Sequence, residues 1–261
     1  MSDGTGTGRV AVGLAIWFLF VLVGWNLHVV GATGAASLVY ASLVLGLICC
    51  LLPWIHASSV GRHAPLLRAW HDPAVPLDAV SFAAIAVASI ALAALLPDVA
   101  RQEGRLCVDA AMQWLVWIRG FLTVDMPGLT GFGALLLAFV MSAVAEEILY
   151  RGYLQRYVFG HWKRPWAVLF TTLLFTLGHA SRGNTLGIFV IGIVLGTAVE
   201  ITGRVWVSVL MHATLNLVVL ALTETGELER LYCPWAWLSL PVLVGALVYL
   251  RRHLRRRAAA R

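Results

Sequence analysis

Long apolar runs separated by short polar segments make up most of the sequence. They cover residues 10–31, 34–56, 77–97, 129–155, 165–181, 184–202, 204–223 and 232–250. An α-helix needs about 20 predominantly apolar residues to cross the hydrocarbon core of a bilayer, and these runs are of that order. The pattern therefore predicts an all-α, polytopic integral membrane protein with about eight transmembrane helices.

The segment 98–128 departs from this pattern because charged residues interrupt its apolar positions. Its middle is expected to form an amphipathic helix at the membrane interface, with Trp114 and Trp117 in the headgroup layer. A short additional span is the alternative. The chain then divides, within one structural domain, into N-terminal transmembrane helices plus an interfacial segment, a helical core, and a last transmembrane helix with a basic tail: residues 1–128, 129–223 and 224–261.

The composition supports a membrane protein and argues against a nucleic-acid-binding protein. The chain is 60% hydrophobic and 12% charged, whereas soluble domains are roughly 45–50% apolar and about 25% charged. The net charge of +6 does not indicate nucleic-acid binding, because much of it lies in the tail RRHLRRRAAAR and no recognition module accompanies it. If the tail is cytoplasmic and the eight spans alternate, most of the Lys and Arg residues lie on the cytoplasmic side, as the positive-inside rule requires. This orientation predicts that both termini are cytoplasmic.

The four cysteines show no CxxC motif and no Cys/His spacing typical of zinc sites. With both termini inside, Cys107 and Cys233 fall on the outer side of the membrane. The sequence leaves open whether they form a disulfide.

Several polar side chains interrupt the apolar runs in the second half of the chain. They are Glu146, Glu147, Arg151, His179, Glu200, His212 and Asn216. A charge near the bilayer centre costs roughly 2.5–3.5 kcal/mol, so ionisable groups there are candidates for function. Glu200 is the exception, because its i, i+4 spacing with Arg204 at a helix end favours a simple ion pair.

Helical spacing separates the two adjacent carboxylates. Glu147 and Arg151 are four residues apart, so they share a face and can pair. Glu146 points about 100° away from Glu147 on an α-helix, and its i+4 neighbour is Tyr150 rather than a cation. Glu147 is thus expected to be structural, and Glu146 to be available as a general base.

His212 and Asn216 are also four residues apart, in LMHATLN. A ring nitrogen and an amide on one helix face make a suitable pair of donors for a developing oxyanion. His179 follows Gly178, which permits close approach of another backbone. The three helices are expected to bring these groups together in a buried intramembrane active site.

Three motifs in this region resemble those of the CPBP family of CAAX proteases and bacteriocin-processing enzymes. EEILYR resembles its EExxxR motif, FTLGH its FxxxH motif, and HATLN its HxxxN motif, in the same order and on separate apolar runs. The flanking RGYLQ and TGRVW are similar as well. The resemblance covers roughly residues 130–220.

The resemblance implies an intramembrane endopeptidase that cleaves a membrane-associated protein or peptide, in a bacterial inner membrane. It implies that Glu146 and His179 activate a water, that His212 and Asn216 stabilise the oxyanion, and that Glu147 and Arg151 support the architecture. No HExxH motif is present. A glutamate-activated water requires no cofactor, but zinc is possible, with Glu146, His179 and His212 as its ligands.

Two other functions are compatible with the composition. A non-catalytic membrane scaffold or chaperone has no need of all four polar groups at Glu146, His179, His212 and Asn216. A proton-coupled transporter is expected to show repeats or broken helices in matching halves, and the sequence shows no such pairing. Substrate identity and oligomeric state are not specified by the sequence.

Overall fold

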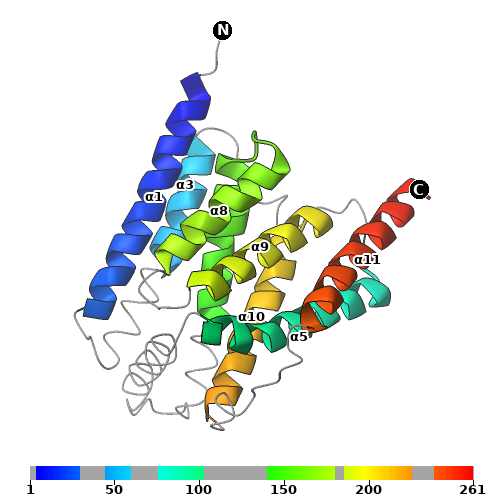
Figure 1. Ribbon diagram of the computed structural model, residues 1–261. Helices are drawn as coiled ribbons and strands as arrows, with labels where there is room; N and C mark the ends of the chain where they lie inside the picture. The colour runs from blue at the N-terminus through cyan, green and yellow to red at the C-terminus, as the bar shows by residue number, and fades with distance from the viewer. Residues whose placement is uncertain are drawn as a thin grey trace, which may run out of the picture.

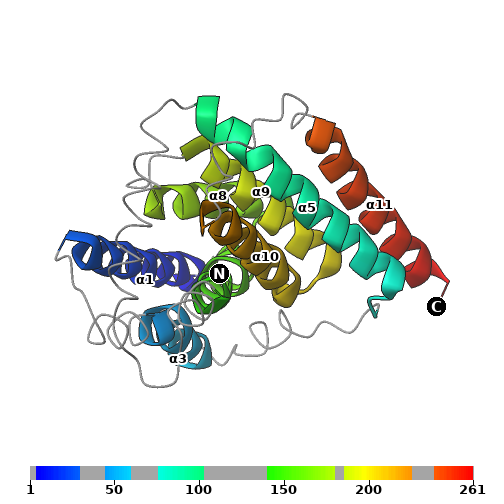
Figure 2. The same cartoon turned by 90° about the horizontal axis from the view of Figure 1, so that it is seen from below.

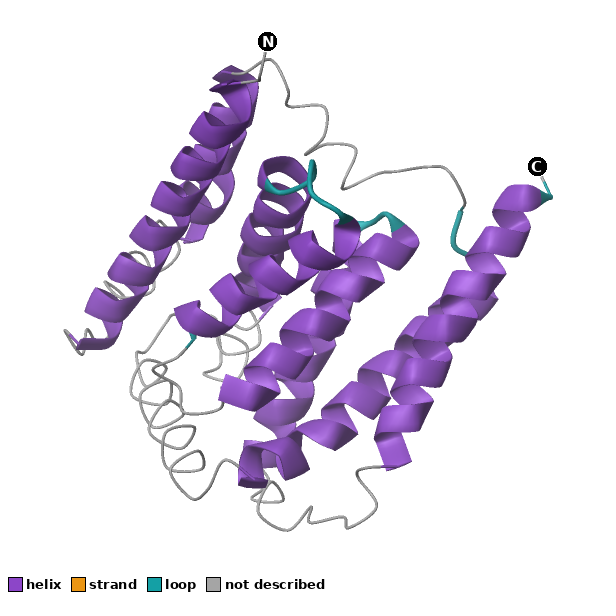
Figure 3. Cartoon of the chain, turned by 45° about the horizontal axis from the view of Figure 1, so that its top comes forward, coloured by secondary structure: helices purple, strands orange, loops and turns teal. Residues whose placement is uncertain are grey.

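The computed structural model describes residues 4–29, 45–59, 76–102, 140–179, 185–224 and 238–260, and these residues are almost entirely helical (Figure 3). The elements are α1 (Gly4–Val29), η1 (Leu45–Leu51), α3 (Leu52–Ser59), α5 (Ala79–Gln102), η2 (Ile148–Val158), α8 (Arg164–Gly178), α9 (Thr185–Thr202), α10 (Val205–Glu224) and α11 (Ser239–Ala259). Helical residues 140–147 lead directly into η2. The all-α prediction is confirmed for this part of the chain.

Within the described residues, each predicted apolar run contains a helix, with ends that differ from the prediction. The largest difference is at the C-terminus, where α11 continues to Ala259, so the arginines of the tail extend a helix instead of following it. α5 runs on to Gln102 and takes in the start of the predicted interfacial segment. The rest of that segment, Cys107 and Cys233 lie outside the described residues, so the interfacial helix and the disulfide stay predictions.

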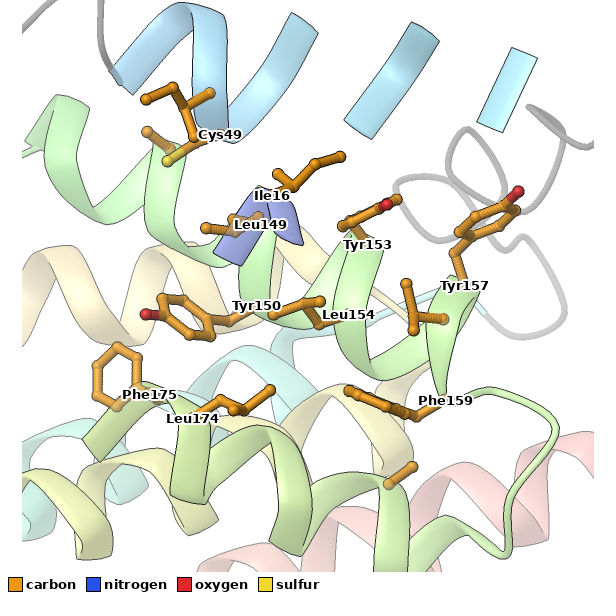
Figure 4. Packing of buried hydrophobic residues seen from close by; sticks show 14 of the residues in the cluster. Ile16, Cys49, Leu149, Tyr150, Tyr153, Leu154, Tyr157, Phe159, Leu174 and Phe175 are labelled. Atoms are coloured by element: carbon orange, nitrogen blue, oxygen red, sulfur yellow. The ribbon is translucent and has the colours of Figure 1, made fainter. Parts of the chain in front are cut away.

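The helices pack in two groups (Figures 1 and 2). In the first, α1, η1 and α3 pack against η2 and α8 around an aromatic-rich core that includes Tyr150, Tyr153 and Phe159 (Figure 4). In the second, α5 and α11 pack side by side and cover α9 and α10. Contacts of η2 with α9 and α10 join the groups, so the three motif-bearing helices meet at their boundary.

The helix that carries EEILYR changes type within the motif. Residues 140–147 are α-helical, whereas Ile148–Val158 form a π-helix that ends with a hydrogen bond from Phe159 N to Leu154 O of 2.9 Å. π-helical turns are rare and occur frequently at functional sites. The sequence predicts an α-helix here, so the π-helical form of Ile148–Val158 is a difference from that prediction.

Large apolar side chains cover much of the outer surface. Phe18, Ile90, Trp166 and Leu177 are each more than half exposed. Among the described helices, α9 alone is both long and apolar enough to cross a membrane by itself. Shorter apolar stretches occur in α1, across η1 and α3, in α5 and in α10. α1 begins and α11 ends on the same side of the molecule (Figure 1), as the expectation of two cytoplasmic termini requires.

Asp78 fastens the start of α5 to the basic end of α11. Its Oδ1 accepts hydrogen bonds from the Ser81 hydroxyl at 2.7 Å and the Ser81 backbone N–H at 2.9 Å, which is the geometry of a helix N-cap. Its Oδ2 lies 2.9 Å from His253 Nε2 and 3.1 Å from Arg257 Nη1. The hydrogen bonds from Ser81 and His253 and the charge of Arg257 hold the pKa of Asp78 below its usual range.

This contact predicts a loss of stability in acid. Because the folded-state pKa of Asp78 is depressed, its contribution is complete above the unfolded-state value of about 3.9 and is lost as the pH falls below it. We expect Asp78→Asn, which keeps the cap acceptor but not the charge, to melt below wild type near neutral pH. The difference should shrink as the pH is lowered from about 7 to about 2. A difference that does not change with pH would contradict this role.

Candidate active site

Glu146 and His179 meet in the interior although they come from different helices. Glu146 lies on the last turn before η2, and His179 is the residue at which α8 ends. The two side chains are 8% and 5% exposed, and His179 Nε2 lies 3.4 Å from Glu146 Oε2. The structure thus brings together the two residues from which the sequence predicted water activation.

The contact of His179 with a backbone carbonyl determines which of its ring nitrogens carries the proton. His179 Nδ1 lies 2.7 Å from the Phe175 carbonyl oxygen. A carbonyl only accepts, so Nδ1 carries the proton, and in the neutral ring Nε2 presents its lone pair. Nε2 and the carboxylate oxygen of Glu146 are then two proton acceptors directed at one small volume.

Glu147 is held from two sides. Its Oε2 lies 3.3 Å from Arg151 Nε, four residues later on the same helix, and its Oε1 lies 2.9 Å from His212 Nδ1 on α10. Glu147 and Arg151 are fully buried. The predicted Glu147–Arg151 pair is confirmed, and His212 is an additional partner that helical spacing does not reveal.

The bond to Glu147 determines how His212 is oriented. A carboxylate accepts, so Nδ1 of His212 donates and Nε2 is directed away from Glu147. A carboxylate in this position holds an imidazole in one tautomer and stabilises the imidazolium form. As an imidazolium, His212 presents an Nε2–H donor from a residue that is 7% exposed.

Phe175 joins the two pairs. Its ring centroid lies 4.4 Å from that of His179 and 6.0 Å from that of His212. The guanidinium carbon of Arg151 lies 5.4 Å from the same ring centroid. Because one side chain contacts both histidines and the arginine, the Glu146–His179 and Glu147–His212 pairs form a single site. Asn216 lies one turn beyond His212 on α10 and is half-buried.

Residues 128–218, a segment that contains all of these side chains, match the family model described as Rce1-like, type II CAAX prenyl endopeptidase. The chain carries an Rce1-like domain. The match confirms the resemblance that the three motifs indicate, and it identifies the domain as one of a peptidase family whose members are integral membrane proteins. Comparison with curated proteins and with solved structures gave no match.

The residues of the Rce1-like domain do not fit a three-ligand zinc site as they are placed. Zinc requires its ligand atoms at about 2.0–2.3 Å from one point. Among the described residues, no group of three or more His, Cys, Asp or Glu side chains is close enough to hold a metal ion.

Gly178 sets the position of His179 in the Rce1-like domain. A Cβ at residue 178 would lie 2.6 Å from the hydroxyl oxygen of Tyr150. Tyr150 is fully buried and packs edge-to-face against Phe175 (Figure 4). It packs in the same way against Phe20, so its ring has little room to move aside. The glycine therefore allows α8 to approach η2 closely enough for His179 to reach Glu146.

We expect Gly178→Ala to destabilise the protein by about 1–3 kcal/mol, as overpacking of a core does, and to reduce activity by displacing His179. Tyr150→Phe removes the atom that the new methyl group would strike. The double variant Gly178→Ala/Tyr150→Phe should therefore recover stability, measured by thermal unfolding. If the double variant is no more stable than Gly178→Ala, the close approach is not what the glycine provides.

Sequence reasoning missed three features of the site. It treated Phe175 only as a motif letter, although its ring contacts both histidines. It named Tyr150 only as the i+4 neighbour of Glu146 and gave its ring no role, because aromatic packing looks like ordinary core from the sequence. It paired Glu147 with Arg151 alone, because the contact with His212 joins residues 65 positions apart.

Proposed function

We propose that the protein is an intramembrane endopeptidase that hydrolyses a peptide bond of a membrane-associated protein or peptide, with a water activated by Glu146 and His179. The observation that carries this proposal is the buried pair of acceptors, Glu146 Oε2 and His179 Nε2, 3.4 Å apart. The match to prenyl endopeptidases supports a peptidase and a membrane-associated protein substrate.

In the proposed first step, a water donates its two hydrogens toward Glu146 Oε2 and His179 Nε2, and its lone pair points to the carbonyl carbon of the substrate. Glu146 takes one proton as the water oxygen bonds to that carbon. The π electrons of the carbonyl move to its oxygen, which becomes an oxyanion.

His212 and Asn216 stabilise the oxyanion in this proposal. The Glu147 carboxylate holds His212 so that Nε2–H of the imidazolium donates outward, and the Asn216 amide supplies a second donor from the next turn of α10. A donor of this kind typically contributes about 10²–10³ in kcat. Collapse of the intermediate then breaks the C–N bond, and the leaving nitrogen takes the proton from Glu146.

The membrane is the proposed setting of this chemistry. The exposed apolar side chains of α1, α5 and α8 suit contact with lipid better than contact with water. The eight predicted spans, the cytoplasmic termini and the bacterial inner membrane are parts of the same proposal. A site enclosed by helices excludes lipid from the peptide and strengthens the interactions of its charged groups.

The experiment that tests the function compares the termini of membrane proteins between cells with the wild-type protein and cells with Glu146→Ala. The proposal predicts new C-termini and N-termini that appear only with the wild type. Identical termini in both, together with partners that a pull-down recovers equally well with the variant, would favour a non-catalytic scaffold instead. Substrate flux in reconstituted vesicles would favour a transporter.

Removal of metal ions tests whether the activity requires zinc. The proposed mechanism uses side chains and water, so we expect the purified protein to keep its activity after strict chelation and dialysis. The measurement is the cleavage rate before chelation, after chelation and after zinc is added back. A loss that zinc restores would contradict the metal-free mechanism and would assign Glu146, His179 and His212 as candidate ligands.

A further inference from the structure

A second buried polar chain leads from Arg151 away from the catalytic pairs. Arg151 Nη1 donates to Gln155 Oε1 at 3.4 Å, and Gln155 Nε2 donates to the Gly196 carbonyl at 3.1 Å and to Glu200 Oε1 at 2.9 Å. Gln155 is 1% exposed. Gln155 thus accepts a hydrogen bond from Arg151 and donates hydrogen bonds to two groups of α9.

Glu200 brings a helix without any of the three motifs into this chain. It lies near the end of α9, and its side chain is 23% exposed. Its Oε2 is 3.7 Å from Arg164 Nε, whose side chain is 81% exposed. Its contacts here come from η2 and α8. The pairing with Arg204 that the sequence favoured stays a prediction. The chain therefore runs from the buried guanidinium of Arg151 to the surface.

Gly196 makes room for this arrangement. A Cβ at residue 196 would lie 3.0 Å from Gln155 Oε1 and from Val168 Cγ1, and 3.3 Å from Arg151 Nη1. These distances are tighter than ordinary van der Waals contact. Glycine at residue 196 therefore allows the backbone of α9 to lie closer to Arg151 and Gln155 than a residue with a side chain would allow.

We propose that Gln155 and Glu200 are positioning residues for the catalytic site. Arg151 is fully buried, and a buried guanidinium needs partners for its N–H groups. Glu147 Oε2 forms an ion pair with the guanidinium, 3.3 Å from Nε. Gln155, itself held by Glu200 and the Gly196 carbonyl, accepts a hydrogen bond from Nη1. This second contact fixes the rotation of the guanidinium, which sets where Glu147 lies and hence how Glu147 holds His212.

This inference rests on the proposed function, so its test includes a readout that needs no cleavage. The imidazole NMR signals of His212, assigned by loss in His212→Gln, are compared in 15N-histidine-labelled protein. We expect them to shift in Gln155→Leu and in Glu200→Leu. They should stay in place in Thr171→Val, which removes a fully buried hydroxyl that donates along α8 to the Ala167 carbonyl.

Kinetics supply the second readout. We expect Gln155→Leu to lower kcat about tenfold or more with KM little changed, because a displaced His212 weakens the transition state more than substrate binding. Glu200→Gln keeps an acceptor for Gln155 Nε2 and should retain most of the activity that Glu200→Leu loses. If Gln155→Leu does not fold, Gly196→Ala replaces it, since its methyl group displaces the same two side chains.

Two results would overturn the inference. One is a set of His212 signals that superimpose on those of the wild type in Gln155→Leu and Glu200→Leu. The other is a kcat of Gln155→Leu within about twofold of wild type, measured in an assay in which Glu146→Ala shows no activity. If wild type and Glu146→Ala are equally inactive, the proposed function fails, and the His212 signals alone decide whether the chain positions that residue.

Discussion

The Glu146→Gln variant is expected to lose about 10²–10⁴-fold in kcat while it folds as the wild type does, because glutamine occupies the same volume but cannot accept the proton of the water. His179→Ala should have a similar effect, since it removes the second acceptor of the pair. Because the two groups act on one water, the double variant should be scarcely worse than either single variant. The measurement is the cleavage rate of a membrane-anchored peptide by purified protein.

Ser89→Ala is a suitable control for these variants. Ser89 is buried on α5 and donates to the Ile85 carbonyl at 2.9 Å within its own helix. Its replacement tests for general damage to a buried polar position and should leave cleavage unchanged. Undiminished cleavage by both Glu146→Gln and His179→Ala would remove the assigned roles of these residues.

Arg151→Met is expected to be the most destabilising single change at the site. It leaves the fully buried Glu147 carboxylate without its guanidinium partner, and the loss of one member of a buried ion pair typically costs about 3–5 kcal/mol. The loss should be measured by denaturant unfolding in detergent. It should appear without any substrate, which separates this structural role from catalysis.

The double variant Glu147→Gln/Arg151→Met tests the cause of that loss. Removal of both charges eliminates the uncompensated carboxylate, so the double variant should be more stable than Arg151→Met alone. It should remain inactive, because Glu147 also holds His212. If Arg151→Met unfolds within about 1 kcal/mol of the wild type, the pair does not have the structural role assigned to it.

Sequence reasoning predicted the contacts that helical periodicity determines. The pairing of Glu147 with Arg151 follows from a spacing of four residues, and the separate direction of Glu146 follows from the turn of the helix. The order of the motifs indicated which helices meet. The meeting of Glu146 with His179, 33 positions apart, was expected from the motifs but depends on how α8 packs against η2.

Other features depend on tertiary packing that no local pattern encodes. The bond between Glu147 and His212 joins the residue before η2 to α10, and the bond between Gln155 and Glu200 joins η2 to α9. The π-helical form of η2 is defined by backbone hydrogen bonds such as that from Phe159 N to Leu154 O, which the apolar pattern of the sequence does not encode. The tail arginines were expected to follow the last helix. Instead α11 continues through them, and Arg257 pairs with Asp78 and donates to the Pro76 carbonyl just before α5.

The most direct measurement of the central claim is hydrolysis in water labelled with oxygen-18. Purified wild-type protein in lipid bicelles is incubated with a library of membrane-anchored peptides, prenylated and unprenylated, and the products are analysed by mass spectrometry. The account predicts fragments that carry one labelled oxygen in the new C-terminal carboxylate, and none with Glu146→Gln. Wild-type protein that yields no labelled fragment, or Glu146→Gln that yields as many as the wild type, would contradict it.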